Sequence, residues 1–136
     1  MSDVKEFFRA YGEAATGEDV IKIADFFSHS FLVVAPNESR SFSNDGNFLK
    51  WLQSVYKFNR KTGLRQMVVR KVDEQSFSRH AIQAEVTWGA LYEKTGDQVI
   101  EFTIHYILQE QGSKLKIILY ASDQDQEEIM KEKGLL

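Results

Sequence analysis

Three stretches of the chain repeat apolar residues at the three- and four-residue spacing of an amphipathic helix. The first runs from Val4 to Ala15, and Gly17 ends it. The second starts after Glu18 and Asp19, which favour a helix start because they lie at the positive end of the helix dipole. The third runs from Phe48 to Asn59. The apolar positions of the second and third stretches are Val20, Ile23, Ala24 and Phe27, then Phe48, Leu49, Leu52, Val55 and Tyr56.

A change from helix to strand is expected near His29. This residue follows the second helical stretch, and we interpret it as a cap at the negative end of that helix and not as a ligand. The apolar, β-branched run Phe31–Ala35 predicts a buried strand that ends at Pro36. We expect the polar segment from Glu38 to Asp45 to be a loop.

After Thr62 and Gly63 the apolar period changes from about 3.6 to 2, which is typical of strands. The expected strands are Leu64–Val72, Arg79–Glu93, Gln98–Glu110 and Lys114–Ser122, separated by polar breaks at Asp73–Ser78, Lys94–Asp97 and Gln111–Ser113. Short connections join antiparallel neighbours, so the four strands should form a meander. Such long strands must twist or bulge, which predicts a curled sheet. We expect the charged tail Gln124–Lys133 to be a short surface helix or a frayed end.

Two of these strands alternate apolar and polar side chains and so predict an inner and an outer sheet face. Small Ala84 and Ala90 flank bulky Trp88 on the inner face, which leaves room there for another body. The helices could fill that room. However, tyrosine and tryptophan carry polar atoms that need partners when buried, and an apolar concavity with a few polar groups is the usual form of a small-molecule site. We therefore predict an apolar pocket lined by Tyr11, Trp88, Phe102, Ile104, Tyr106 and Tyr120.

Composition narrows the class of protein. The 136 residues are the size of one domain, so we expect a single domain over residues 1–136. Cysteine is absent, which excludes disulfides and thiolate chemistry. The net charge is −3 with interspersed signs, so we predict no nucleic-acid partner. Aromatic side chains are not interleaved with the basic residues between Lys57 and Arg70, which favours a solvated surface there. No apolar run suits a leader or a membrane span, so we expect no membrane partner and a cytoplasmic protein.

The order of elements from Val4 to Asp125 resembles the nuclear transport factor 2-like superfamily, which includes ketosteroid isomerase, scytalone dehydratase and small polyketide cyclases. The local matches are Tyr11, Thr16-Gly17-Glu18-Asp19, Phe26-Phe27, Val33-Val34-Ala35-Pro36 and His105-Tyr106 before Gly112. The resemblance implies an α+β, cone-shaped, cystatin-like fold in which three N-terminal helices pack on a strongly curved antiparallel sheet.

The resemblance does not extend to the catalytic residues of ketosteroid isomerase. Tyr11 lies where that enzyme's first-helix tyrosine donates to the developing oxyanion. The position of its catalytic aspartate corresponds to Ala35, and that of its second oxyanion donor corresponds to Ile104. Because proton abstraction next to a carbonyl needs a positioned base, we expect no isomerase activity of that type.

Other catalytic arrangements depend on His105. Sites like those of scytalone dehydratase and the cyclases need a cavity-facing histidine, as the resemblance implies, and alternation places His105 on the outer face. A β-bulge would reverse that and could group His105 with Glu85 and Glu101 as an acid/base cluster. The three histidines are scattered, so we predict no metal site and no cofactor.

Three functions therefore stay open. We favour a binding or accessory module for a small apolar, cyclic molecule; the alternatives are a lyase, isomerase or cyclase using His105 with Glu85 or Glu101, and a protein-interaction module. The outer face mixes polar and apolar side chains as an interface does. We expect a homodimer through Glu85, Thr87, Thr103 and His105.

Overall fold

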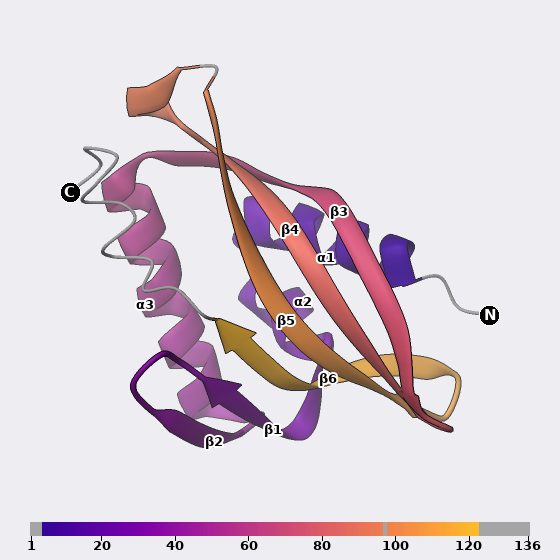
Figure 1. The fold of residues 1–136 in the computed structure, drawn as a ribbon. Coiled ribbons are helices and arrows are strands. Elements are labelled where there is room, and N and C mark those ends of the chain that lie inside the picture. Colours follow the sequence, from indigo (N-terminus) through magenta and orange to yellow (C-terminus); the bar gives the residue numbers. More distant parts are fainter. Residues whose placement is uncertain (1–3, 97, 123–136) are drawn as a thin grey trace.

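The computed structural model describes residues 4–96 and 98–122. Three helices, a six-stranded sheet and one turn of 3-10 helix make up this part of the chain (Figure 1). In chain order these elements are α1 (Val4–Thr16), α2 (Val20–Asp25), β1 (Phe27–Val34), β2 (Ser39–Ser43), α3 (Gly46–Thr62), β3 (Leu64–Ser78), β4 (Ala81–Tyr92), η1 (Glu93–Thr95), β5 (Val99–Gln111) and β6 (Lys114–Ser122). The predicted α+β class, with three helices on one sheet, is confirmed.

Local chemistry sets the helix ends. The Asp19 carboxylate accepts from the Lys22 N–H at 3.1 Å and caps α2. The Asp45 carboxylate accepts from the N–H groups of Asn47 and Phe48 and caps α3. Gly63 ends α3 in the left-handed region, with φ of 80°, where its N–H reaches the last carbonyls of the helix.

The sheet has the strand order β2-β1-β6-β5-β4-β3. Its last four strands form the antiparallel meander that the two-residue period predicts, while β1 joins through a parallel pairing with β6. In Figure 1 the long, twisted strands β3, β4 and β5 lie side by side, with α1 and α2 behind them and α3 alongside. The main core lies between sheet and helices and includes Phe8, Phe48, Trp88, Tyr106 and Leu108.

Three sequence predictions about local structure are wrong. His29 lies in β1, not at a helix end, and Phe26 is the C-cap of α2. The segment expected to be a loop from Glu38 to Asp45 contains the strand β2, which pairs with β1. The supposed break at Asp73–Ser78 continues β3, because its polar residues pair with β4 along the exposed end of the hairpin. The tail Gln124–Lys133 lies outside the described residues.

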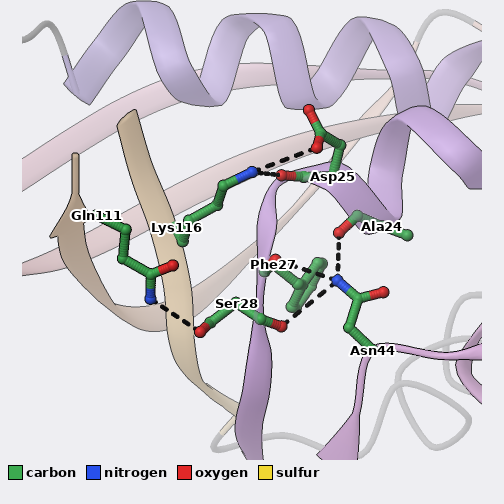
Figure 2. Close-up of polar contacts among 7 residues, drawn as sticks. All are labelled: Ala24, Asp25, Phe27, Ser28, Asn44, Gln111 and Lys116. Carbon is green, nitrogen blue, oxygen red and sulfur yellow. Dashed lines mark hydrogen bonds and ion pairs between the residues drawn. The ribbon is translucent and has the colours of Figure 1, made fainter. Parts of the chain in front are cut away.

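Side chains from three other parts of the chain form hydrogen bonds with the end of α2 and the start of β1 (Figure 2). The Asn44 amide donates to the carbonyl of Ala24 at 2.7 Å and to that of Phe27 at 3.1 Å. The Gln111 amide donates to the Ser28 hydroxyl at 2.9 Å. The Lys116 ammonium donates to the Asp25 carbonyl and lies 3.3 Å from the Asp25 carboxylate. These bonds fix the start of β1, and so position Phe27 in the core.

At the far side of the sheet, α1 covers part of the edge strand β3. The Thr16 hydroxyl accepts from the Met67 N–H at 3.1 Å and lies 3.3 Å from the Met67 carbonyl. The Thr16 hydroxyl therefore forms hydrogen bonds with both the N–H and the carbonyl of Met67. Without it, these two groups of the edge strand could pair with a strand of another chain. Among the described residues, no helix is both long and apolar enough to span a membrane.

Candidate functional site

An apolar cavity lies between α3, the two N-terminal helices and the inner face of the sheet. Its volume is about 120 Å³. Aromatic and aliphatic side chains form nearly all of its wall, which also contains one amide, Asn59. Trp51 lines the cavity and is 40% exposed, so this side of α3 reaches the molecular surface.

Each element contributes to the wall through its own periodicity. Helix α1 contributes Tyr11 and Ala15, which are four residues apart and so lie on one helix face. The alternation of the strands brings Trp88, Phe102, Ile104, Tyr106 and Tyr120 to the inner face, as their cross-strand pairing requires. All six residues predicted for the pocket therefore lie in its wall.

Sequence reasoning missed the part of the wall that α3 contributes. Trp51, Val55 and Asn59 follow one another at four-residue spacing and line the cavity. Helical periodicity could have identified this stripe, since it runs beside the buried positions Leu52 and Tyr56. Trp51 and Asn59 lie at the boundary between core and surface, where helical spacing alone does not distinguish a cavity wall from a solvated face.

The polar atoms in the cavity are mostly phenol hydroxyls. The indole Nε1–H of Trp88 donates to the Tyr106 hydroxyl at 3.2 Å, and both side chains are buried. The ring of Tyr106 lies 5.5 Å from that of Tyr120 and 6.4 Å from that of Tyr11, between ring centres. The centre of the Tyr11 ring lies 5.7 Å from the Trp88 ring. Tyr11, Tyr106, Tyr120 and Trp88 thus form a group of neighbouring rings in the cavity wall.

Burial raises the pKa of these phenols. The pKa of Tyr11 and that of Tyr106 lie well above the ordinary value of 10.0, because burial disfavours the charged phenolate and the neighbouring phenols add to the effect. Burial also raises the pKa of Tyr120 to about 12. At neutral pH all three are uncharged hydroxyl groups that can donate a hydrogen bond.

The proposed acid/base residues lie on the other face of the sheet. Glu85 pairs directly with His105 across β4 and β5, and its carboxylate lies 3.9 Å from the imidazole Nδ1. Glu101 instead contacts Arg70 at 3.2 Å. The β4–β5 pairing is unbroken from Ala81 to Leu91, so no bulge turns His105 toward the cavity. The structure therefore brings Glu85 and His105 together, but away from the apolar wall.

Known proteins agree with this architecture. The family model described as NTF2-like protein (DUF6841) matches residues 2–125. A search of curated proteins finds no relative of the chain.

Several solved structures share the fold at low sequence identity. An NTF-2 like protein of unknown function from Shewanella oneidensis has a TM-score of 0.68 at 10% identity, over 88% of this chain and 94% of that one. A domain of unknown function with a cystatin-like fold from Nostoc punctiforme has a TM-score of 0.67 at 11% identity, over 98% and 84%. A protein from Novosphingobium aromaticivorans, provisionally named scytalone dehydratase, has a TM-score of 0.65 at 13% identity, over 87% and 78%. Identities this low establish the fold alone.

Proposed function

We propose that this chain, which belongs to the NTF2-like protein family (DUF6841), binds a small, uncharged cyclic molecule in its apolar cavity. The observation that carries the proposal is the cavity itself: an aromatic wall with a few neutral hydroxyl groups, in the concavity between helices and sheet. Such a combination is the usual form of a small-molecule site.

The volume limits the size of the ligand. Pockets for drug-sized molecules span about 300–1,000 Å³, whereas a cavity of about 150 Å³ is large enough for benzene. At about 120 Å³ this cavity suits one six-membered ring, with small adjustments of the wall. The aromatic side chains fill the rest of the concavity, so a large polycyclic ligand would have to displace them.

The character of the wall favours binding over catalysis. Among the described residues that line the cavity, none is an aspartate, glutamate, histidine, lysine or arginine. A lyase, isomerase or cyclase of the kind considered above needs a positioned base, and Glu85 and His105 lie on the opposite face. Phenols whose pKa lies far above neutrality donate hydrogen bonds but do not accept protons at pH 7.

Binding can be measured with methylenecyclohexane, a hydrocarbon that has one six-membered ring. In a Trp51→Phe variant the remaining indole is Trp88, whose emission reports on the cavity. We expect the compound to change this emission saturably. It should also raise the free energy of unfolding, by about 1.4 kcal/mol at ten times its dissociation constant.

A cavity-filling variant shows where the compound binds. Ala15→Leu adds a larger side chain to the cavity wall, and it should abolish the emission change without unfolding the protein. Ala10→Leu is the matched control, because Ala10 lies on the same helix but outside the cavity and the core cluster. An unchanged emission in wild type, or binding that survives Ala15→Leu, would contradict the proposal.

A second proposal concerns the outer face of the sheet, where we propose that two copies of the chain associate. This face carries cations and anions side by side, in the pairs Arg70–Glu101 and Lys71–Asp73. The hydroxyls of Thr87 and Thr103 lie 3.4 Å apart between these charges. A two-fold axis here would place a surface of mixed charge against its own copy, where opposite charges can meet.

Light scattering at micromolar concentration tests the association. We expect the mass of a dimer for the wild type and of a monomer for Thr103→Arg, since an added cation at the centre of the face disturbs the pairing. Gln53→Arg, which adds the same charge at an exposed position of α3, should leave the dimer intact. A monomeric wild type would rule the association out.

A further inference from the structure

We propose that the outer side of α3 is a docking surface for an anionic membrane. The surface consists of three lysines, Lys50, Lys57 and Lys61, with the partly exposed indole of Trp51 at its edge. We call the three lysines the lysine row. The docking is peripheral, so it needs no membrane span, and it does not depend on the binding of a ligand in the cavity.

Helical spacing brings the three lysines together. They follow one another at intervals of seven and four residues, which return to the same side of an α-helix. All three are exposed, whereas Leu52 and Tyr56 are buried on the side of α3 that faces the core. At a rise of about 1.5 Å per residue the row is about 16 Å long. Figure 1 shows α3 at one side of the molecule, alongside the sheet.

The lysine row carries positive charge that the described part of the chain does not balance. Helix α3 contains four basic residues and no aspartate or glutamate, although the whole chain has a net charge of −3. Arg60 pairs with Glu18, but no described acidic side chain forms an ion pair with a lysine of the row. On the outer face of the sheet, by contrast, Arg70 lies against Glu101. A local excess of cations attracts a surface of opposite charge.

Trp51 indicates which kind of anionic partner fits. Its ring packs against those of Phe42 and Phe48, at 5.6 and 6.1 Å between ring centres, and 40% of the residue stays exposed. Tryptophan is enriched where lipid headgroups meet hydrocarbon, because its ring is apolar and its N–H is polar. A nucleic acid would need a free ring face on which its bases stack. The Trp51 ring is nearly parallel to the Phe48 ring, at 18°, so part of its face is already in use.

The lysine row lies next to the cavity wall. Trp51 belongs both to the edge of the row and to that wall, whereas none of the three lysines lines the cavity. A bilayer docked on the row would therefore lie close to the cavity, and uncharged apolar molecules concentrate in bilayers. The docking surface and the cavity can still be tested separately, because they use different side chains.

Peripheral docking differs from the membrane contacts that the sequence argues against. The expectation of no membrane partner rests on the lack of an apolar span or leader, whereas a basic surface attracts anionic headgroups without inserting a segment. The segment Lys57–Arg70 by itself suggests only a solvated surface. Lys50 and Trp51 lie outside that segment and come beside Lys57 only when the helix forms.

Vesicle sedimentation tests the docking. The probes are vesicles of phosphatidylcholine and phosphatidylglycerol in equal parts, with vesicles of phosphatidylcholine alone as the uncharged reference. We expect the wild type to bind the anionic vesicles and not the neutral ones, and we expect salt to weaken the binding. A lysine near an anionic surface contributes about 1 kcal/mol, so Lys57→Gln and Lys61→Gln should each weaken the binding about fivefold.

Matched variants show whether the binding involves the lysine row. Lys5→Gln removes the same charge from the first turn of α1, away from α3, and should change the vesicle affinity less than about twofold (Figure 1). Gln53→Lys adds a cation between Lys50 and Lys57 and should strengthen the binding about fivefold. All the substituted positions are exposed, so the variants should unfold in urea like the wild type.

The emission of Trp51 reports on the contact with lipid. Lipids that carry bromine in the acyl chain near the headgroup quench an indole that reaches the interface. We expect anionic vesicles of such lipids to quench the wild type. Trp51→Phe should still bind these vesicles but show little quenching, because the remaining indole, Trp88, is completely buried.

Three results would each overturn the docking. The first is a wild type that does not sediment with anionic vesicles. The second is a loss of binding in Lys5→Gln as large as that in Lys57→Gln, since the attraction would then not be located at α3. The third is binding of single-stranded oligo(dT) through the lysine row without binding of vesicles, which would make the partner a nucleic acid. Methylenecyclohexane should bind Lys57→Gln and Lys61→Gln like the wild type, so a failure of the docking leaves the cavity function standing.

Discussion

Gly12 lies directly beneath the indole ring of Trp88. A Cβ atom at position 12 would lie 3.0 Å from Cζ3 of Trp88 and 3.4 Å from the Met67 carbonyl oxygen. The missing side chain therefore lets α1 approach the sheet closely enough to bury Trp88 completely. This contact links the position of a helix to the wall of the cavity, because Trp88 also lines that cavity.

The variant Gly12→Ala should push Trp88 toward the cavity. Alanine gains about 1 kcal/mol of helix propensity over glycine, which offsets the crowding, so we expect the free energy of unfolding to change by less than about 1 kcal/mol. Binding of methylenecyclohexane should weaken because the cavity shrinks. Gly17→Ala is the control, since a Cβ there would meet only ordinary contacts, at 3.5 Å or more. Unchanged ligand affinity in Gly12→Ala would show that Trp88 does not move.

The tyrosines predict a loss of stability at high pH. The pKa of each of the five tyrosines is raised in the folded protein, and those of Tyr56, Tyr92 and Tyr120 reach about 12. Tyrosines in the unfolded chain ionise near pH 10. The stability that the folded protein gains by keeping its tyrosines protonated is therefore fully present below pH 10, and it is lost as the pH rises from about 10 to 12. The unfolding free energy should fall by about 1.4 kcal/mol per pH unit for each tyrosine that stays protonated only in the folded state.

Absorbance of phenolate at 295 nm checks this directly. The folded protein should show little phenolate at pH 10, whereas the protein in concentrated urea should be about half ionised there. Tyr106→Phe should make the urea-unfolding free energy less dependent on pH between about 10 and 12. A folded protein that titrates with a midpoint near 10 would contradict the burial of these phenols.

The periodicity of apolar residues predicts most of this fold because burial acts on one face of each element. The spacing along α1 and the alternation through Trp88 and Tyr106 identify the sides that face the core, and the predicted pocket residues follow from that. Pairing with distant strands is not encoded in the same local pattern. For this reason the sequence pattern predicts a loop where the polar strand β2 lies, and it does not indicate the parallel pairing of β1 with β6.

His29 shows a second limit of local reasoning. A histidine just after a helical pattern suggests a cap, but α2 ends at Asp25 and β1 begins at Phe27. The Asn44 side chain, fifteen residues further along, supplies the hydrogen bonds that allow this early end. No sequence period could reveal that contact, because it joins segments that meet only in the folded chain.

Asn44 is therefore expected to be sensitive to a change of one atom. In Asn44→Asp a carboxylate oxygen would face the carbonyl oxygens of Ala24 and Phe27 in place of the donating amide. Two buried acceptors would lose their donor and meet a negative charge, so we expect a loss of about 2–4 kcal/mol in the free energy of unfolding.

The control for this change is Asn47→Asp. Asn47 is exposed in the first turn of α3, where a negative charge interacts favourably with the helix dipole. Its substitution should be neutral or stabilise by a few tenths of a kcal/mol. Equal effects of the two substitutions in urea unfolding would mean that the Asn44 bonds contribute little.

Trp88 offers the strongest test of the cavity, because it is both a buried core residue and part of the cavity wall. Its ring packs against Phe8 and Tyr11, and none of its surface is exposed. Trp88→Ala should therefore reduce the free energy of unfolding by about 3–5 kcal/mol.

The same truncation should join the space of the lost indole to the existing cavity of about 120 Å³ and create room for a bicyclic molecule. Added indole should then restore stability in Trp88→Ala, by about 1.4 kcal/mol at ten times its dissociation constant. It should not stabilise the wild type, whose cavity admits only one ring. Trp51→Ala serves as the control: Trp51 is 40% exposed, so its loss should reduce stability by less and leave no enclosed space for indole. A loss of stability below about 1 kcal/mol in Trp88→Ala would show that Trp88 is not an ordinary core residue. Equal stabilisation of both variants by indole would show that the space left by Trp88 does not join the cavity.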